Sequence, residues 1–271
     1  TPSGLTVSPD GAKLYVTCGG PKGLVCVVET GSGDVVSTIA VGHTPRSPVL
    51  LLDGKRLVVC NQFTDDVSFI DLAAGKESAR VKAIREPYGV AASPDGSLVF
   101  VTNLLPVDAS DSYDVASEVT VIETATLETS SIRLPNGSSS VHEVCVSPDG
   151  TYAYVAHILS RYQMPTTQLE RGWMNTNALS IIDVAERKLL NTVLLDDIDL
   201  GAANPWGVAT TADGKRIIVS HWGTHELSVI DAEGLIEKLK SIPKTIEEAK
   251  KVGRYDTQGT YSPVTVDDVP N

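Results

Sequence analysis

The chain lacks several features that would narrow its function at once. Its 22 lysines and arginines are outnumbered by 34 aspartates and glutamates, which gives a net charge of −12. Nucleic acid and anionic membrane surfaces are therefore disfavoured as partners, because both attract basic proteins. No apolar run approaches the ~20 residues of a membrane span, so we predict none. The negative net charge is compatible with a cationic redox partner, although solubility alone also explains it.

Cysteine is scarce, and contiguous catalytic motifs are missing. The four cysteines are too few and too scattered for a disulfide scaffold, and they indicate no compartment. Cys18 and Cys26 flank one predicted hairpin loop, so a disulfide between them is feasible and depends on their distance. Cys60 and Cys145 are expected to be buried as small apolar residues. The sequence has no G-x-S-x-G elbow, P-loop or G-x-G-x-x-G fingerprint, and no visible signal peptide.

What the chain does contain is one short pattern repeated five times. Each copy reads as a strand, an Asp-Gly turn, a second strand ending in a polar residue, and a third strand ending in an acid. The turns lie at 8–11, 52–54, 93–96, 147–150 and 212–214, the second strands at 13–18, 56–61, 98–103, 152–157 and 216–221, the third strands at 25–29, 67–71, 119–123, 179–183 and 227–231, and fourth strands at 35–41, more weakly 79–84, then 127–134 and 189–195. Self-similarity at about 40 residues with four strands per unit predicts an all-β fold, a β-propeller of four-stranded antiparallel blades.

Elementary physics supports the same interpretation. Asp-Gly between two alternating apolar runs is a hairpin signal, because glycine accepts positive φ and aspartate bonds its own backbone. One small sheet cannot bury its apolar faces alone, whereas sheets stacked around an axis bury both faces.

The repeat also resembles a known family. SPDG followed by YVTC, FVTN or YVAH, and then by VSFID, LSIID or LSVID, is similar to YVTN-repeat β-propellers over residues 4–231. The resemblance implies an exported bacterial or archaeal protein, periplasmic or at the cell surface, often with seven blades. Residues 157–183 resemble a subgroup joined to di-haem cytochrome c peroxidase-like modules, which implies a cytochrome-type redox partner. The chain has no C-x-x-C-H haem attachment sequence, so such a module would lie outside it.

The pattern predicts two regions. Residues 1–233 are expected to form blades one to five, and residues 234–271 a helical or irregular extension that leads into missing blades. Helix-forming segments occur at 233–240 and 245–252, and blade five has no obvious outer strand. We therefore expect part of a seven-bladed propeller, with a five-bladed ring as the alternative. The remaining blades would then count among the partners of this chain.

Histidines gather at one end of the predicted blades, where the loops from second to third strands and the links between blades lie. His157 and His221 end equivalent second strands, His142 opens blade four, and His225 follows His221 in a loop. One hypothesis is a metal or cofactor site in which these four imidazoles bind copper, zinc or iron, with Glu143 orienting or ligating. The alternative is that each histidine hydrogen-bonds at a strand end. No contiguous ligand motif decides between them.

Two loops add further candidates. Arg161 and Arg171 with Trp173 in the blade-four insertion, and Trp206 and Trp222 at the same end, are residue types that dominate binding surfaces. Trp173 could equally pin its long loop to the blades.

The blade-three insertion carries Asp108, Asp111, Asp114 and Glu118. Their carboxylates could hold calcium, but the spacing is not that of an EF-hand and a solvated acidic loop is the favoured reading.

Three functional classes follow. We favour a binding or scaffold propeller that docks a partner protein through its loop-rich face and is not catalytic on its own. The first alternative is a metal- or cofactor-dependent oxidoreductase, or a subunit of a haem redox protein, with its site at the histidine-rich channel mouth. The second is a lactonase-like hydrolase, for which His142 with Glu143 is the one neighbouring acid–base pair. The fold does not choose between them.

Overall fold

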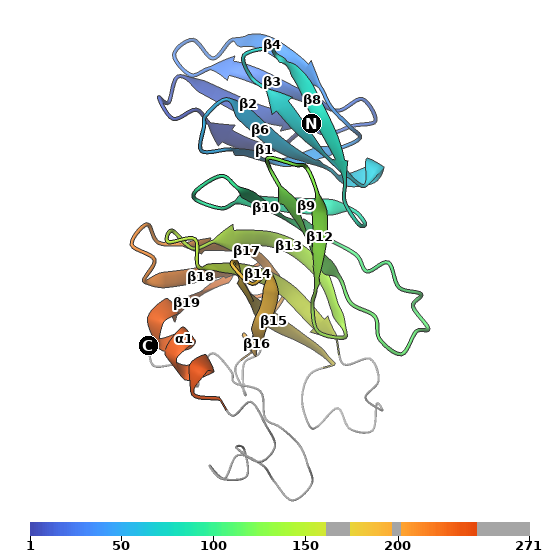
Figure 1. Ribbon diagram of the computed structural model, residues 1–271, viewed down its shortest axis with the longest axis vertical. Helices are drawn as coiled ribbons and strands as arrows, with labels where there is room; N and C mark the ends of the chain where they lie inside the picture. Colours follow the sequence, from blue (N-terminus) through green and yellow to red (C-terminus); the bar gives the residue numbers. More distant parts are fainter. Residues whose placement is uncertain (161–173, 197–201, 243–271) are drawn as a thin grey trace, which may run out of the picture.

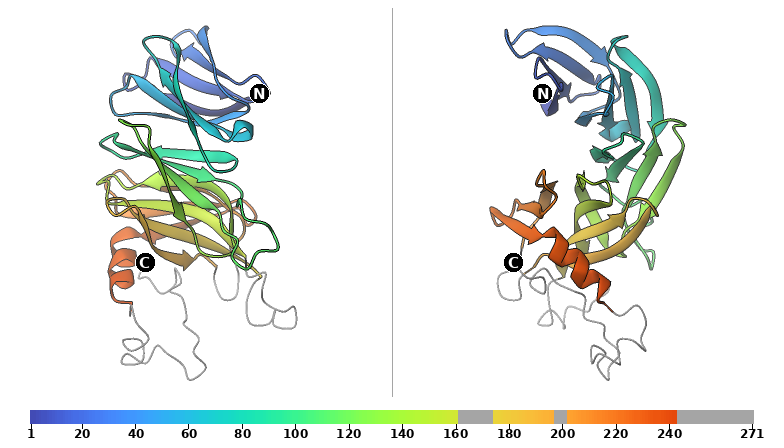
Figure 2. Two further views of the ribbon diagram at one scale, coloured as in Figure 1. Left: turned by 45° about the vertical axis from the view of Figure 1, so that its right-hand side comes forward. Right: turned by 60° about the vertical axis from the view of Figure 1, so that its left-hand side comes forward.

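The computed structural model describes residues 1–160, 174–196 and 202–242. Within these residues, five antiparallel sheets follow one another along an arc, each rotated against the last (Figures 1 and 2). This arrangement confirms the predicted class, an all-β propeller built of antiparallel blades. The predicted helix at 245–252 lies outside the described residues.

The strands run in chain order from the inner to the outer rim of each blade. Blade one contains β1 (Pro2–Val7), β2 (Lys13–Cys18), β3 (Leu24–Glu29) and β4 (Val35–Ala40); blade two β5 (Pro45–Leu50), β6 (Arg56–Asn61), β7 (Asp66–Asp71) and β8 (Lys76–Lys82), with a 3-10 turn η1 (Gln62–Thr64); blade three β9 (Pro87–Ala92), β10 (Leu98–Asn103), β11 (Glu118–Glu123) and β12 (Thr129–Arg133); blade four β13 (Ser138–Val146), β14 (Tyr152–Ser160), β15 (Asn175–Asp183) and β16 (Lys188–Leu194); blade five β17 (Pro205–Thr210), β18 (Arg216–His221) and β19 (Glu226–Asp231).

The Asp-Gly turns form as the sequence predicts. In blade one, Ser8 Oγ donates to Asp10 and accepts from the amide of Lys13, while Gly11 takes a φ of 70°. A hydroxyl two residues before the aspartate makes the same bond in blades three, four and five. The turn is therefore built alike in these four blades; in blade two Leu51 replaces the hydroxyl residue, and Asp53 accepts from the amides of Lys55 and Arg56. The turn fixes the register of the two strands that it joins.

Apolar side chains fill the space between neighbouring blades. Phe100 and Val121 of blade three, for example, share one buried cluster with Val155 and Ile182 of blade four. Equivalent clusters join blades one to two, two to three and four to five. Each blade thus buries its faces against its neighbours, as propeller packing requires.

Blade five departs from the others. Its sheet has three strands, and helix α1 (Ala232–Lys240) follows β19 directly. The helix begins at Asp231, whose carboxylate accepts from the amide of Gly234, and it buries Leu235 and Leu239 in the core between blades four and five. A helix was predicted at 233–240, and it packs beside a blade for which the sequence indicates no outer strand. None of the described helices has the length and hydrophobicity to cross a membrane.

Candidate functional site

One position of the repeat changes from blade to blade and lines the inner rim. It is the residue seven places before the turn aspartate, on the innermost strand. Blade one has Ser3 there, and the next four blades have Arg46, Tyr88, His142 and Trp206. Neighbouring innermost strands contact one another, so the last four side chains form a continuous row. We call Arg46, Tyr88, His142 and Trp206 the inner row.

The inner row is held by ring contacts. The Arg46 guanidinium carbon lies 4.5 Å from the centre of the Tyr88 ring, and Nη1 donates to the Tyr88 hydroxyl over 3.4 Å. Tyr88 meets His142 edge to face at 5.1 Å between centres, and His142 stacks on Trp206 at 3.8 Å. Trp222, from the loop after β18, packs at right angles against Trp206 at 4.8 Å. Such contacts hold the rings in fixed relative positions.

The backbone is strained just before each member of the inner row. Thr44, Glu86, Ser140 and Asn204 each stand two residues before a member of the row, and each has a φ between 48° and 53°. Non-glycine residues rarely adopt this left-handed conformation. The first strand pair of every blade also shifts register close to the row. Bulges and strained residues of this kind re-aim side chains and are frequent at functional sites.

Within the inner row, Arg46 carries a charge whereas the ring of His142 is neutral. Burial, and secondly the charge of Arg46, lowers the pKa of His142 to about 4, so its ring is neutral at physiological pH. The buried Nδ1 of His142 has no hydrogen-bond partner. Burial raises the pKa of the neighbouring Glu143 to about 7. The row therefore combines one guanidinium with uncharged aromatic rings. The rings suit a planar or apolar group of a partner, and the guanidinium suits an acidic group next to it.

A hollow of about 500 Å³ extends the row at blade five. Trp206, Trp222 and His225 line it together with the buried His221. The indole of Trp222 is 62% exposed, an unusual degree for so large an apolar side chain. Trp206, Trp222 and His225 were all predicted for this end of the blades, and the structure brings them together.

His157 and His221 have a different environment. His157 is completely buried, and its Nε2 lies 2.8 Å from Ser180 Oγ; His221 Nε2 lies 2.8 Å from Ser228 Oγ. The same two positions of the repeat are joined in the other blades by Cys18 with Cys26, Asn61 with Ser68, and Asn103 with Thr120. The end of every second strand therefore bonds to the third strand, whichever residue it carries.

This equivalence bears on the metal hypothesis. Among the described residues, no group of three or more His, Cys, Asp or Glu side chains is placed to hold a metal ion. Both ring nitrogens of His157 already have partners, Ser180 Oγ and the carbonyl of Ile158. Of the four imidazoles proposed as ligands, His142 belongs to the inner row, and His157 and His221 occupy the strand-end position. The strand-end alternative therefore accounts for the contacts of the last two.

The other candidates are placed as follows. Arg133, at the end of β12, pairs with Asp108 at 2.9 Å, Asp114 at 3.5 Å and Glu118 at 3.3 Å, so one guanidinium offsets much of the negative charge of the blade-three insertion. Arg161, Arg171 and Trp173 lie outside the described residues.

Cys60 and Cys145 were expected to be buried, and a disulfide between Cys18 and Cys26 was considered feasible. Cys60 is fully buried and Cys145 half-buried. Cys18 and Cys26 are free thiols whose sulfurs lie 3.5 Å apart in a hydrogen-bond contact, so no disulfide joins them in this structure.

Acid stability should report on the buried histidine. Burial lowers the folded-state pKa of His157 from 6.5 to about 4, so only the unfolded chain gains this proton as the pH falls from 6.5 towards 4. Stability from this group is full above pH 6.5 and is lost below it, by about 2 kcal/mol at pH 5. His142 acts in the same direction, and Glu143, whose pKa is raised, acts in the opposite one. We expect urea unfolding at pH 7.5 and pH 5 to show a smaller loss for His157→Asn than for the wild type. If both proteins lose the same stability between pH 7.5 and pH 5, the pH dependence does not come from buried His157.

Comparisons with known proteins agree with the fold. No family model matches the chain. Hydrazine synthase subunit beta of Kuenenia stuttgartiensis is 28% identical over 57% of this chain and 39% of its own length. The seven-bladed β-propeller protein Rv1057 of Mycobacterium tuberculosis is 28% identical over 58% of this chain and 36% of its own length. Each match thus spans well under half of the relative.

Among solved structures, Kuenenia stuttgartiensis hydrazine synthase matches with a TM-score of 0.58 and 24% identity, covering 93% of this chain and 82% of that one. These findings support a β-propeller rather than the YVTN-repeat family in particular. The chain is a β-propeller whose described blades present an aromatic inner row at their loop-rich end.

Proposed function

We propose that this propeller is a binding module that docks a partner protein through its loop-rich end, with the inner row and Trp222 at the centre of the contact. The observation that carries the proposal is the ordered run of Arg46, Tyr88, His142 and Trp206 at one repeat position, extended by the exposed Trp222. The few residues that contribute most of the binding energy in protein interfaces are enriched in arginine, tyrosine and tryptophan.

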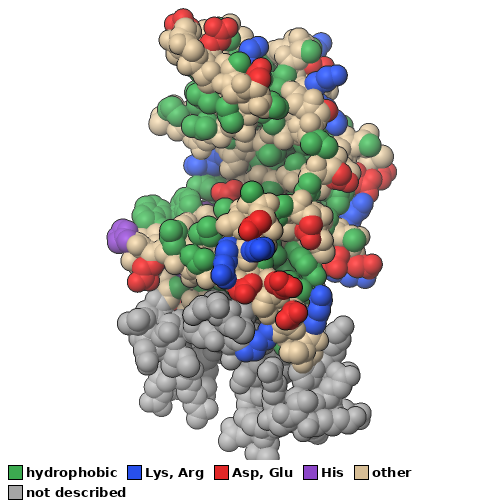
Figure 3. Space-filling model, turned by 90° about the vertical axis from the view of Figure 1, so that its left-hand side faces the viewer, with side chains coloured by type: hydrophobic (Ala, Val, Ile, Leu, Met, Phe, Trp, Pro, Cys, Tyr) green, Lys and Arg blue, Asp and Glu red, His purple; other side chains and the backbone are tan. Residues whose placement is uncertain are grey.

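A second observation concerns the two ends of the arc. Leu5 and Val7 of blade one are 65% and 49% exposed, and Leu227 and Val229 of blade five are 65% and 55% exposed. Figure 3 shows apolar side chains reaching the molecular surface. The equivalent faces inside the arc are buried between blades. Because one relative is described as seven-bladed, further blades are the proposed cover for both end faces.

The name of one relative supports docking of this propeller to a partner protein. That relative is named as a subunit of hydrazine synthase, which is a precedent for a related chain in a protein assembly. A cytochrome-type redox module as partner, and an exported location, rest on the resemblance to YVTN-repeat propellers and remain parts of the proposal.

Loss of Trp222 tests the docking end. Wild type, Trp222→Ala, Arg46→Gln and Glu186→Gln are compared for capture of a protein from the source organism and for the affinity of the captured protein. We expect Trp222→Ala and Arg46→Gln to weaken binding about tenfold each, since central aromatic and arginine contacts contribute ~1–2 kcal/mol or more.

Glu186→Gln is the matched control, because Glu186 is 70% exposed at the opposite end of blade four. The proposal fails if no protein is captured, or if the three variants bind it as the wild type does.

A further inference from the structure

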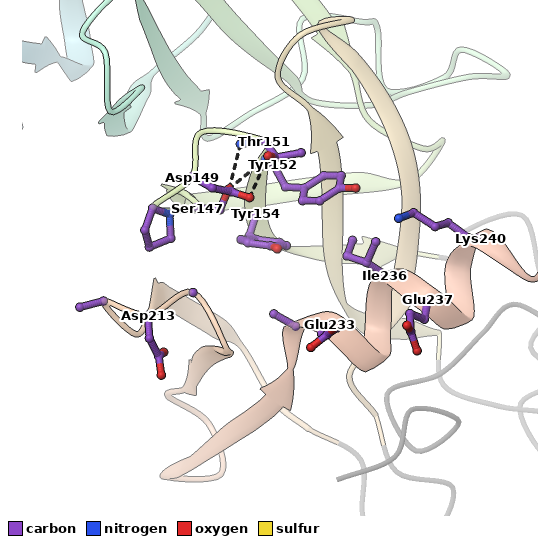
Figure 4. Close-up of a pocket in the computed structure, with 14 residues that line it drawn as sticks. Ser147, Asp149, Thr151, Tyr152, Tyr154, Asp213, Glu233, Ile236, Glu237 and Lys240 are labelled. Atoms are coloured by element: carbon purple, nitrogen blue, oxygen red, sulfur yellow. Dashed lines mark hydrogen bonds between the residues drawn. The ribbon is translucent and has the colours of Figure 1, made fainter.

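The opposite end of the blades carries a separate cleft. It lies between the Asp-Gly turns of blades four and five and helix α1, and its volume is about 610 Å³ (Figure 4). Tyr152, Tyr154 and Ile236 line its apolar part. Its charged lining residues are Asp149, Asp213, Glu233, Glu237 and Lys240. We call this site the turn-side cleft.

The cleft is acidic. Four carboxylates line it against one ammonium group, that of Lys240, which extends from the end of α1 towards Tyr152 in Figure 4. Asp149 and Asp213 accept hydrogen bonds within their own turns. Neither Glu233 nor Glu237 pairs with a cation in the described part of the chain. The cleft therefore has uncompensated negative charge beside two tyrosine rings.

The Tyr154 hydroxyl is open to a ligand in the cleft. Tyr154 is 2% exposed and its hydroxyl lines the cleft, yet it makes no hydrogen bond with any described residue. Burial raises the pKa of this phenol, so it remains protonated and can donate or accept. The hydroxyl oxygen is not among the buried side-chain atoms of the described residues that lack a partner, so it reaches the space of the cleft. A ligand in the cleft can therefore hydrogen-bond to it.

The preceding blade provides an internal comparison. The groove between blades three and four measures about 380 Å³, and Arg187 lines it while pairing with Glu123 at 2.7 Å. Arg187 stands four residues after the end of β15. The residue four places after the end of β19 is Leu235, which is buried in the core instead. Blade five thus lacks the arginine that blade four contributes to its groove, and the space left beside its acids is larger.

We propose that the turn-side cleft binds a guanidinium or primary ammonium group, carried by a basic side chain of a partner or by a free polyamine. The carboxylates of Glu233 and Glu237 supply the charge, the rings of Tyr152 and Tyr154 a surface for a cation, and the Tyr154 hydroxyl a hydrogen bond. This site does not depend on docking at the loop-rich end.

Calorimetric titration at low salt tests the proposal with two probes, spermidine and N-acetylarginine amide. We expect saturable binding of at least one probe at one site per chain, weakened about five-fold in Glu233→Gln/Glu237→Gln. Tyr154→Phe, which keeps the ring, should weaken binding by a smaller factor, and Lys240→Gln should strengthen it. Binding of arginine amide alone assigns a guanidinium from a side chain, and preferential binding of spermidine assigns a polyamine.

Glu226→Gln, at the other end of blade five, is the matched charge control and should bind as the wild type does. The proposal is overturned if neither probe saturates, or if Glu226→Gln and the double variant weaken binding equally, because general attraction to an acidic protein would then explain it.

Discussion

Replacing His157 with alanine is expected to lower the free energy of unfolding by about 3 kcal/mol, because it leaves a cavity and removes a buried hydrogen bond. The ring is fully buried and lies 2.8 Å from Ser180 Oγ. Ser180 would keep Thr192 Oγ1 as a partner at 2.7 Å, so the loss comes mainly from the ring and its space. Chemical denaturation of the two proteins at pH 7.5 measures the difference.

Asparagine provides the control at the same position. Asn61 and Asn103 occupy the equivalent place in blades two and three, where each donates to a hydroxyl of the third strand. We therefore expect His157→Asn to cost about 1 kcal/mol, much less than alanine does. A metal ligand would behave otherwise, since either substitution would remove it. If asparagine and alanine destabilise equally, the equivalence of the strand-end positions is wrong.

Replacing Gly89 with alanine is the second change for which we expect a large effect. A Cβ at Gly89 would lie 2.4 Å from the carbonyl oxygen of His142 and 3.0 Å from the Cα of Glu143. Both atoms are backbone of the next blade, so the clash is relieved only by moving innermost strands apart. We expect a loss of about 3 kcal/mol or more, measured by denaturation, together with altered tryptophan emission from the displaced inner row.

The repeat again supplies a matched control. Gly207 holds the same position in blade five, but the nearest contact of a Cβ there is Ser220 Oγ at 3.2 Å, a side-chain atom that can shift. Gly207→Ala should therefore cost under about 1 kcal/mol. Comparable losses for the two variants would mean that contact between blades does not determine the effect.

The fold could be predicted from sequence because its signals are local and repeated. The Asp-Gly turns and the alternating strands recur five times, and each depends on residues a few places apart. The fourth strand of blade two was the weakest signal, around 79–84, and β8 is observed at Lys76–Lys82. Its alternation of exposed and half-buried residues is that of an outer strand, which has little apolar patterning to detect.

The candidate site was predicted only in part. Histidines and tryptophans were assigned to the correct end of the blades, but Arg46 and Tyr88 were missed. Each of these is unremarkable within its own strand, and its role emerges from contact with the next blade. Alignment of the innermost strands on the turn aspartate would have found them, because all members of the row stand seven residues before it. The Nε2 bond of His157 depends on Ser180, 23 residues away, which spacing alone does not reveal.

The most direct test of partner docking at the loop-rich end is hydrogen–deuterium exchange of the chain alone and bound to its captured partner. The account predicts new protection at residues 44–48, 86–90, 140–144, 204–207 and 221–226, which hold the inner row and Trp222. It predicts that the outer strands exchange unchanged. Protection confined to the Asp-Gly turns, with no change around Tyr88, His142 and Trp206, would contradict it.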